Sequence, residues 1–72
     1  MSFKITVALH LDGGLRRESL WVTESTTYED LLEHFAINPE TVVVLQGGVP
    51  KPFDDSVSSD GEIVVLKIVS GG

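Results

Sequence analysis

The 72-residue sequence contains no cysteine, which excludes disulfide bonds, thiolate zinc sites and a cysteine nucleophile within this chain. Basic residues are also few, since five Lys and Arg stand against eleven Asp and Glu and leave a net charge of −6. Nucleic acid and anionic lipid repel a chain of that charge, so we expect neither as a partner. No apolar run approaches the roughly 20 residues that cross a bilayer, and residues 1–4 lead into an alternating segment without a signal-peptide core. The sequence therefore predicts a cytoplasmic protein with no membrane partner.

Residue types that perform catalysis or bind metals are present, but their spacing matches no known site. His10 and His34 fall in different predicted elements without a His-x-x-x-His pattern, so we expect no metal site. Asp54, Asp55 and Asp60 lie in one polar segment, where carboxylates could weakly hold a cation but are usually just hydrated. Neither a Ser-His-Asp arrangement nor a phosphate-cradling loop with lysine is visible. We expect that the chain is not an enzyme and binds no cofactor of its own.

Five segments have the composition of strands. Alternating apolar and polar residues over 3–11 give the first strand one apolar face, and Asp12-Gly13-Gly14 is typical of a hairpin turn. In the returning strand Leu20 and Val22 share one face, whereas Trp21 lies on the other. Prolines reduce the fourth segment to a short edge piece, because proline cannot donate to a sheet. The strands are expected over residues 3–11, 16–23, 41–45, 49–52 and 63–69.

One helix is expected between the second and third strands. Thr26-x-x-Glu29 and Thr27-x-x-Asp30 both match the capping box, in which side chains satisfy the free amides of the first turn. The Asn38-Pro39 pair should end the helix, because the residue before proline is pushed out of the helical conformation. Apolar residues at helical spacing predict one face packed on the sheet. These residues are Tyr28, Leu31, Leu32 and Phe35.

This order of elements predicts an α+β domain, in which a mixed four- to five-stranded sheet has one helix packed on one face. We assign residues 1–69 to the domain and residues 70–72 to a flexible tail. The first and last strands are the most apolar, and a right-handed crossover through the helix favours placing the third strand, parallel or antiparallel, beside a central pair. Residues 53–60 should form a polar loop with Phe53 and Val57 anchored beneath it.

The C-terminal stretch is the most distinctive part of the sequence. Six of the seven residues 63–69 are β-branched or leucine, and a run of this kind between Asp60-Gly61 and Ser70-Gly71-Gly72 is typical of a strand buried on both sides. Gly71 and Gly72 have no side chains and wide backbone freedom, so they could enter a narrow cleft of another protein. The alternative is that two terminal glycines occur by chance.

The helix opening Thr-Tyr-Glu-Asp-Leu-Leu at residues 27–32, the Asp60-Gly61 turn and the terminal Gly71-Gly72 together resemble the ubiquitin-like β-grasp sulfur carriers. That family includes the thiamine sulfur carrier, the molybdopterin-synthase small subunit, the ubiquitin-related modifier and the small archaeal modifier proteins. The resemblance extends over the whole chain and implies a ubiquitin-like β-grasp fold. Ser70, which precedes the glycines, is small, as the sulfur carriers prefer.

The resemblance also implies a function. In that family an E1-like adenylyltransferase activates the terminal glycine carboxylate with ATP, and sulfur converts the acyl-adenylate to a thiocarboxylate. Carried onto this chain, the reacting residue is Gly72, preceded by Gly71. ATP and magnesium would be supplied by the activating enzyme. The sulfur would pass to a sulfur-accepting synthase in thiamine or molybdopterin synthesis, or to tRNA thiolation.

Two other functions remain open. The chain could be a ubiquitin-like modifier joined through Gly72 to lysines of target proteins, or it could be a passive β-grasp interaction module whose glycines do not react. In each case we expect a monomer.

A docking surface for the activating enzyme is predicted on the last strand. Alternation alone would place Lys67 outward, whereas counting back from the diglycine, as the resemblance suggests, places Ile63 and Val65 inside. We follow the resemblance, because the stem of Lys67 can lie along the core edge while its ammonium reaches water. Apolar side chains left exposed on the other face would indicate a binding site. The predicted members of that site are Val64, Leu66, Ile68, Trp21 and Val44.

Overall fold

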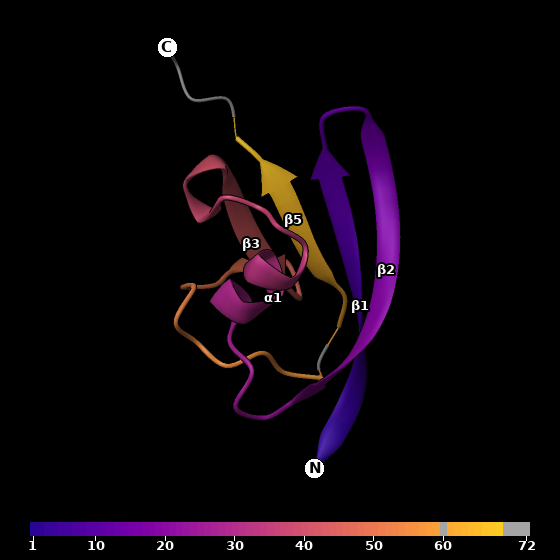
Figure 1. The fold of residues 1–72 in the computed structure, drawn as a ribbon, viewed down its shortest axis with the longest axis vertical. Coiled ribbons are helices and arrows are strands. Elements are labelled where there is room, and N and C mark those ends of the chain that lie inside the picture. Colours follow the sequence, from indigo (N-terminus) through magenta and orange to yellow (C-terminus); the bar gives the residue numbers. More distant parts are fainter. Residues whose placement is uncertain (60, 69–72) are drawn as a thin grey trace.

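The computed structural model describes residues 1–59 and 61–68, which form a five-stranded mixed sheet with one α-helix on one face (Figure 1). In chain order the elements are β1 (Ser2–Leu11), β2 (Gly14–Thr23), α1 (Tyr28–His34), the 3-10 turn η1 (Pro39–Thr41), β3 (Val42–Gln46), β4 (Val49–Pro50) and β5 (Ile63–Lys67). The strand order across the sheet is β2-β1-β5-β3-β4. β1 and β5 pair in parallel, and the other neighbours pair antiparallel. The predicted α+β architecture is confirmed, and β3 is antiparallel to the central β1–β5 pair.

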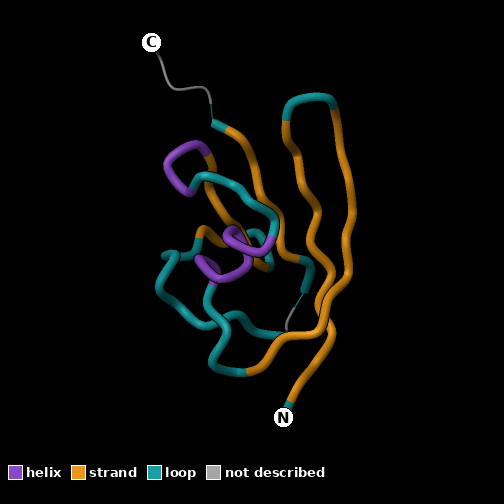
Figure 2. The backbone as a smooth tube through the Cα atoms, in the orientation of Figure 1, coloured by secondary structure: helices purple, strands orange, loops and turns teal. Residues whose placement is uncertain are grey.

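β1 and β2 form a hairpin that sets the length of the molecule. Their ten-residue strands pair from Ser2 with Thr23 at one end to Leu11 with Gly14 at the other. β5 pairs with β1 only between Val7 and His10. The N-terminal half of β1 and the matching half of β2 therefore extend past the other strands (Figures 1 and 2), and the molecule measures 42 × 22 × 22 Å.

α1 begins with a complete capping box. The Thr27 hydroxyl accepts a hydrogen bond from the Asp30 amide (3.2 Å), and the Asp30 carboxylate accepts one from the Thr27 amide (3.0 Å). The hydroxyl of Thr26, the other candidate cap, instead accepts a hydrogen bond from the Thr23 amide (3.1 Å). Of the two capping patterns in the sequence, only the second one is therefore used.

α1 ends at His34, earlier than the Asn38-Pro39 boundary predicted from the sequence. The chain leaves the helix through Ala36, whose φ of 58° lies in the left-handed region. Pro39 then begins η1, in which the Asn38 side chain accepts a hydrogen bond from the Glu40 amide (3.0 Å). Glycine is the usual residue in a left-handed helix terminus, so an alanine there leaves no signal in the sequence.

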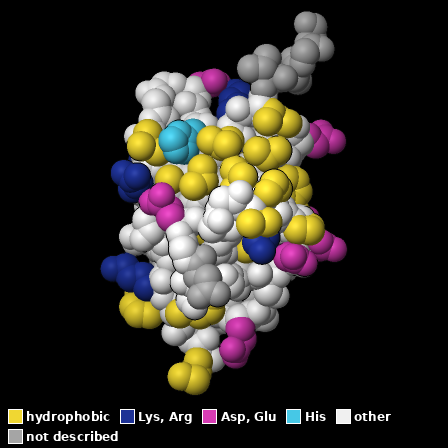
Figure 3. Space-filling view, turned by 180° about the vertical axis from the view of Figure 1, so that it is seen from behind, with side chains coloured by type: hydrophobic (Ala, Val, Ile, Leu, Met, Phe, Trp, Pro, Cys, Tyr) yellow, Lys and Arg dark blue, Asp and Glu magenta, His cyan; other side chains and the backbone are white. Residues whose placement is uncertain are grey.

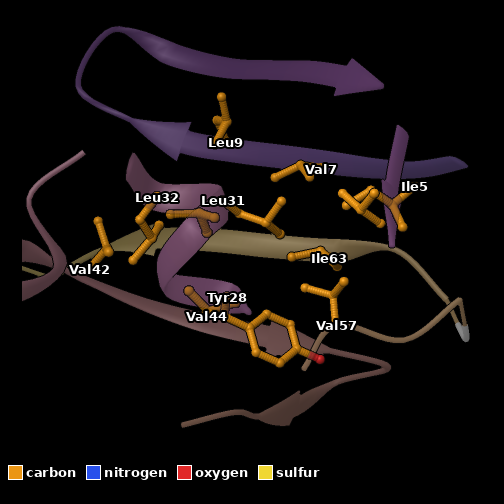
Figure 4. Close-up of a cluster of buried hydrophobic side chains, with 12 residues drawn as sticks. Ile5, Val7, Leu9, Tyr28, Leu31, Leu32, Val42, Val44, Val57 and Ile63 are labelled. Carbon is orange, nitrogen blue, oxygen red and sulfur yellow. The ribbon is translucent and has the colours of Figure 1, made fainter. Parts of the chain in front are cut away.

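The core lies between α1 and the sheet. Figure 4 shows Tyr28, Leu31 and Leu32 of α1 directed at side chains from β1, β3 and β5. From the loop before β5, Val57 is buried and Phe53 packs partly against the same cluster, which confirms the two predicted anchors. The buried cluster consists of Ile5, Val7, Leu9, Val22, Tyr28, Leu31, Leu32, Val42, Val44, Val57, Ile63 and Val65.

β5 is buried on one face only, which corrects the expectation of a strand buried on both sides. α1 covers one face of the sheet, and within residues 1–59 and 61–68 no element covers the other (Figure 1). Ile63 and Val65 are therefore 0% and 1% exposed, whereas Val64 and Leu66 are only half-buried. A continuous apolar run does not reveal how many faces the fold covers.

Gln46, at the end of β3, ties the loop before β5 to the sheet. Its buried side chain accepts a hydrogen bond from the Tyr28 hydroxyl and donates to the carbonyls of Ser58 (2.8 Å) and Gly61 (3.2 Å). The amide is thus satisfied at both ends, which removes the penalty for burying it. Burial raises the pKa of Tyr28, and the nearby charge of Asp55 raises it further. This network fixes the position from which β5 starts.

Candidate docking face and the end of strand β5

The side chains of β5 alternate between the core and the face of the sheet opposite α1, which we call the open face. Ile63 and Val65 point to the core, so the orientation inferred from the resemblance is confirmed. Lys67 lies at the end of the strand on the core side, opposite Val42, and its ammonium forms an ion pair with Asp12 of the hairpin turn. The lysine head therefore leaves the core edge as expected, and one ion pair joins β5 to the hairpin.

Apolar side chains from β3 and β5 lie together on the open face. Leu66 is paired with His10 of β1 on one side and with Val43 of β3 on the other. Leu45, two residues beyond Val43, therefore shares its face. Figure 3 looks at this face and shows hydrophobic side chains gathered in the half of the molecule where β5 ends. We call this group the open-face patch, and its members are Val43, Leu45, Val64, Leu66 and Ile68.

Val44 is not part of the patch, so its prediction as a docking residue is wrong. It is 2% exposed and pairs with Val65 on the core side of the sheet. Its neighbours Val43 and Leu45 occupy the open face instead, and Val43 is 37% exposed. Residues 42–45 are four consecutive apolar residues, so the sequence has no alternation of polar and apolar residues that would show which side chains face the core. The register with β5 determines which of these side chains face the core.

Trp21 lies on the open face as predicted but is not next to Leu66. It is 68% exposed and pairs with Lys4, whereas Leu66 pairs with His10. Lys4 and His10 are six residues apart along β1, which separates the two positions by roughly 20 Å. Trp21 therefore stands on the free half of the hairpin, and the patch does not include it.

Charged groups border the patch without entering it. Arg17 of β2 and Glu62, the residue before β5, form an ion pair of 2.9 Å that spans β1. Ala8 of β1 pairs with Arg17 on one side and with Val64 on the other, and its small side chain is 1% exposed. An apolar centre with a polar border is the usual composition of a protein-binding surface.

The predicted reacting residues, Gly71 and Gly72, lie outside the described residues, as do Val69 and Ser70. The last described residue, Ile68, is 43% exposed, and its amide donates a hydrogen bond to the Thr41 carbonyl (2.9 Å). This bond continues the pairing with β3 beyond the end of β5. The backbone is thus held by the sheet up to Ile68, which is itself a member of the open-face patch.

Neither a metal site nor a membrane-spanning helix is found among the described residues. Within residues 1–59 and 61–68, no group of three or more His, Asp or Glu side chains could hold a metal ion. Asp54 and Asp55 belong to no such group, and Asp60 lies outside the described residues. In the described part of the chain, no helix has the length and apolarity needed to span a membrane.

Comparison with protein families gives a match over nearly the whole chain. A model of the family "Small archaeal modifier protein 2" matches residues 3–69. Small archaeal modifier protein 2 of Haloferax volcanii is 39% identical over 51 residues, which cover 71% of this chain and 76% of that protein. The sulfur carrier protein TtuB of Thermus thermophilus is 32% identical over 56 residues, which cover 78% of this chain and 86% of that protein.

Among solved structures, the chain is similar to a Caldiarchaeum subterraneum ubiquitin. The TM-score is 0.72, the match covers 100% of both chains, and the sequence identity is 17%. A similarity at this identity concerns the fold alone. It confirms the ubiquitin-like β-grasp fold that the resemblance implied.

Proposed function

Since this chain belongs to the small archaeal modifier protein 2 family and has a ubiquitin-like β-grasp fold, we propose that it carries sulfur on its C-terminal glycine. In this proposal an E1-like enzyme adenylates the Gly72 carboxylate, and a sulfur donor converts the adenylate to a thiocarboxylate. The sulfur then passes to a cofactor-synthesising synthase or to tRNA thiolation. The sulfur carrier TtuB supports this assignment as a relative.

The chemistry requires activation because a carboxylate is a poor electrophile. Attack of a Gly72 carboxylate oxygen on the α-phosphate of ATP would release pyrophosphate and leave AMP as the leaving group. A sulfur nucleophile would then displace AMP and form the carbon–sulfur bond, as in other two-step acyl transfers. The proposal assigns ATP, magnesium and the catalytic residues to the activating enzyme.

The open-face patch is the observation that carries the proposal. An activating enzyme must hold the domain while residues 69–72 enter its active site, and the patch includes Ile68, directly before those residues. Aliphatic and aromatic anchors usually contribute most of the energy of such docking. Exposed apolar side chains gathered on one face of a small domain are typical of a binding surface.

A second function is favoured by the family itself. The Haloferax volcanii relative is named a modifier, and the same Gly72 adenylate could acylate a lysine amine of a target protein and release AMP. Both fates start from one activated intermediate. Whether a sulfur donor or a lysine attacks it would depend on the partner.

Intact-mass measurement separates these functions. The chain is incubated with ATP, magnesium, a sulfur donor and a cognate E1-like enzyme. A mass increase equal to one oxygen-to-sulfur exchange supports sulfur carriage, and covalent attachment of the whole chain through Gly72 to lysines of other proteins supports modification. A chain lacking Gly72 should show neither product while melting like the parent. If the parent chain forms neither product, the result supports a passive interaction module.

The docking role of the patch is tested by Leu66→Glu. Leu66 is half-buried on the open face, so the carboxylate can reach water and the fold should persist. We expect adenylation to fall by at least tenfold, about 1.4 kcal/mol. Ser19→Glu places the same charge on the open face of β2, outside the patch, and should leave adenylation unchanged. Equal adenylation by the two variants would remove the patch from the docking surface.

A further inference from the structure

A groove lies at the C-terminal end of α1, on the side of the sheet opposite the open-face patch. It has a volume of about 440 Å³, which falls within the roughly 300–1,000 Å³ typical of ligand-binding clefts. The connection from α1 to η1 forms one wall, and Figures 1 and 2 show how this connection crosses beside the helix. The residues that line the groove are Glu29, Leu32, Glu33, Ala36, Ile37, Asn38 and Pro39.

The apolar part of the groove is held in place by the helix terminus. The Ala36 amide donates to the Glu33 carbonyl (3.0 Å), and the Ile37 amide donates to the Leu32 carbonyl (2.8 Å). These two bonds are those of the Schellman motif, which brings the residue after the left-handed position against the last turn of the helix. Leu32 and Ile37 therefore meet in the groove, and the left-handed conformation of Ala36 fixes its methyl group beside them.

Two carboxylates stand at the edge of this apolar surface. Glu29 and Glu33 are one helical turn apart, a spacing that brings their Cβ atoms within about 6 Å of each other. Both are exposed, and neither belongs to any of the ion pairs found among residues 1–59 and 61–68. No Lys or Arg is among the lining residues. Like charges at this spacing destabilise a helix slightly, so a cation between them would be favoured.

We propose that this groove binds an arginine side chain of a partner protein. The aliphatic stem would lie on Ala36 and Ile37, above the buried Leu32, and the guanidinium would reach the two carboxylates. Arginine suits the site better than lysine, because its planar fork of five N–H donors can bond two carboxylates at once. Lysine offers a compact and strongly hydrated charge.

The position of the groove makes this interaction compatible with docking on the other face. Pro39 lines the groove and begins η1, and η1 ends at Thr41, which accepts the hydrogen bond from Ile68. The groove and the open-face patch therefore lie at the same end of the molecule but on opposite sides of the sheet. A partner in the groove would leave Leu66 accessible.

The test is an NMR titration of the 15N-labelled chain with N-acetyl-arginine amide. Amide signals of Glu33, Ala36 and Ile37 should shift, and the neutral isostere N-acetyl-citrulline amide should bind roughly three- to tenfold more weakly, the range expected for exposed charge-assisted contacts. N-acetyl-lysine amide should also bind more weakly than the arginine probe. Equal binding of citrulline would overturn the role of the carboxylates, and equal binding of lysine would overturn the assignment to arginine.

Paired variants complete the test. The double variant Glu29→Gln/Glu33→Gln removes two like charges from one helix face, so its fold should persist, and it should lose the preference for arginine over citrulline. Glu24→Gln/Asp54→Asn removes the same number of exposed charges outside the groove and should keep that preference. The proposal is wrong if both variants behave alike or if the signals that shift lie elsewhere. The titration needs neither ATP nor an activating enzyme, so its outcome is independent of the proposed function.

Discussion

The apolar side chains on the two faces of β5 differ in exposure although they alternate along one strand. Ile63 and Val65 point to α1 and are 0% and 1% exposed, whereas Ile68, the first residue after β5, is 43% exposed on the open face. Leu66, which is also on the open face, is half-buried. The difference arises because the domain has one helical layer for a sheet with two faces.

This comparison separates stability from binding. Apolar side chains beneath α1 are removed from water by folding itself, and they stabilise the domain by roughly 25 cal/mol per Å² of buried apolar surface. Folding buries the apolar side chains of the open face only in part, so they gain the rest of that energy when another protein covers them. Substitutions on the core face should therefore change the free energy of unfolding, and those on the open face should change association with a partner.

The largest effect is expected for Val65→Glu. An unpaired carboxylate at this buried position costs several kcal/mol, against a total stability of about 4–10 kcal/mol for a domain of this size. The variant should be unfolded by circular dichroism, whereas Leu66→Glu on the neighbouring position should melt near the parent. A folded Val65→Glu chain would mean that the two faces of β5 do not differ in the way described here.

The sequence predicted most of the fold because most elements carry local signals. Alternation in residues 3–11, the Asp12-Gly13-Gly14 turn and the Thr27 capping box each specify a local structure. The helix end was predicted several residues too late, because the alanine at position 36 adopts a conformation that the sequence favours only for glycine or asparagine.

The candidate site was predicted less completely, because faces and distances are set by pairing between strands. Val44 was placed on the wrong face because residues 42–45 are uniformly apolar. Only their register with β5 shows which of them face the core. Trp21 was placed on the right face but in the wrong neighbourhood. Nothing in the sequence indicates that β5 pairs only with residues 7–10 of β1 and leaves the N-terminal half of the hairpin, where Trp21 lies, without a neighbouring strand. The groove depends on the left-handed conformation of Ala36 at the helix end, and an alanine at that position gives no signal in the sequence.

A smaller but still large effect is expected for Leu31→Ala on the helix face. Leu31 is 2% exposed and lies outside the groove, so truncation leaves a cavity and should cost about 2–5 kcal/mol. Leu45→Ala on the open face removes the same atoms from a half-buried position, where neighbours and solvent can fill the space. Urea unfolding of both variants should show the larger loss for Leu31→Ala. Equal losses would indicate that the open face is as well packed as the core.

The third prediction concerns how the free energy of unfolding depends on pH through Tyr28 of α1, the one tyrosine of the chain. Burial and the charge of Asp55 raise its pKa above the ordinary value of 10.0, so the folded state holds the phenolic proton more tightly than the unfolded chain. The resulting stability is fully present below pH 10 and falls as pH rises from there through the folded pKa, by up to about 1.4 kcal/mol per pH unit.

Tyr28→Phe is the matched control for this titration. It removes the hydroxyl that donates to Gln46, whose oxygen keeps a contact from the Ser58 amide (3.3 Å), so the loss below pH 10 should be about 1 kcal/mol. Above pH 10 the difference between parent and variant should shrink. Urea unfolding on both sides of pH 10, with tyrosinate absorbance as the monitor of Tyr28, gives both quantities. A difference that stays constant with pH would contradict the raised pKa.

The smallest effect is expected for Ala36→Gly, which changes a residue just after the end of α1 and leaves the residues of the sheet unchanged. The left-handed conformation costs an L-residue roughly 1–2 kcal/mol, and glycine avoids that cost but adds about 0.4–1 kcal/mol of unfolded-state entropy. The balance is a stabilisation of about 0.5–1 kcal/mol, measurable as a higher urea midpoint at an unchanged slope.

Gly13→Ala provides the reverse substitution as a control, because Gly13 has φ 94° in the hairpin turn and no atom within 4 Å of an added methyl group. It should destabilise the chain through backbone strain alone. Ala36→Gly should leave docking on the open-face patch unchanged and should weaken arginine binding, since it removes a methyl group from the groove. If Ala36→Gly destabilises the chain instead, the methyl group contributes more to the packing of Leu32 and Ile37 than its backbone conformation costs.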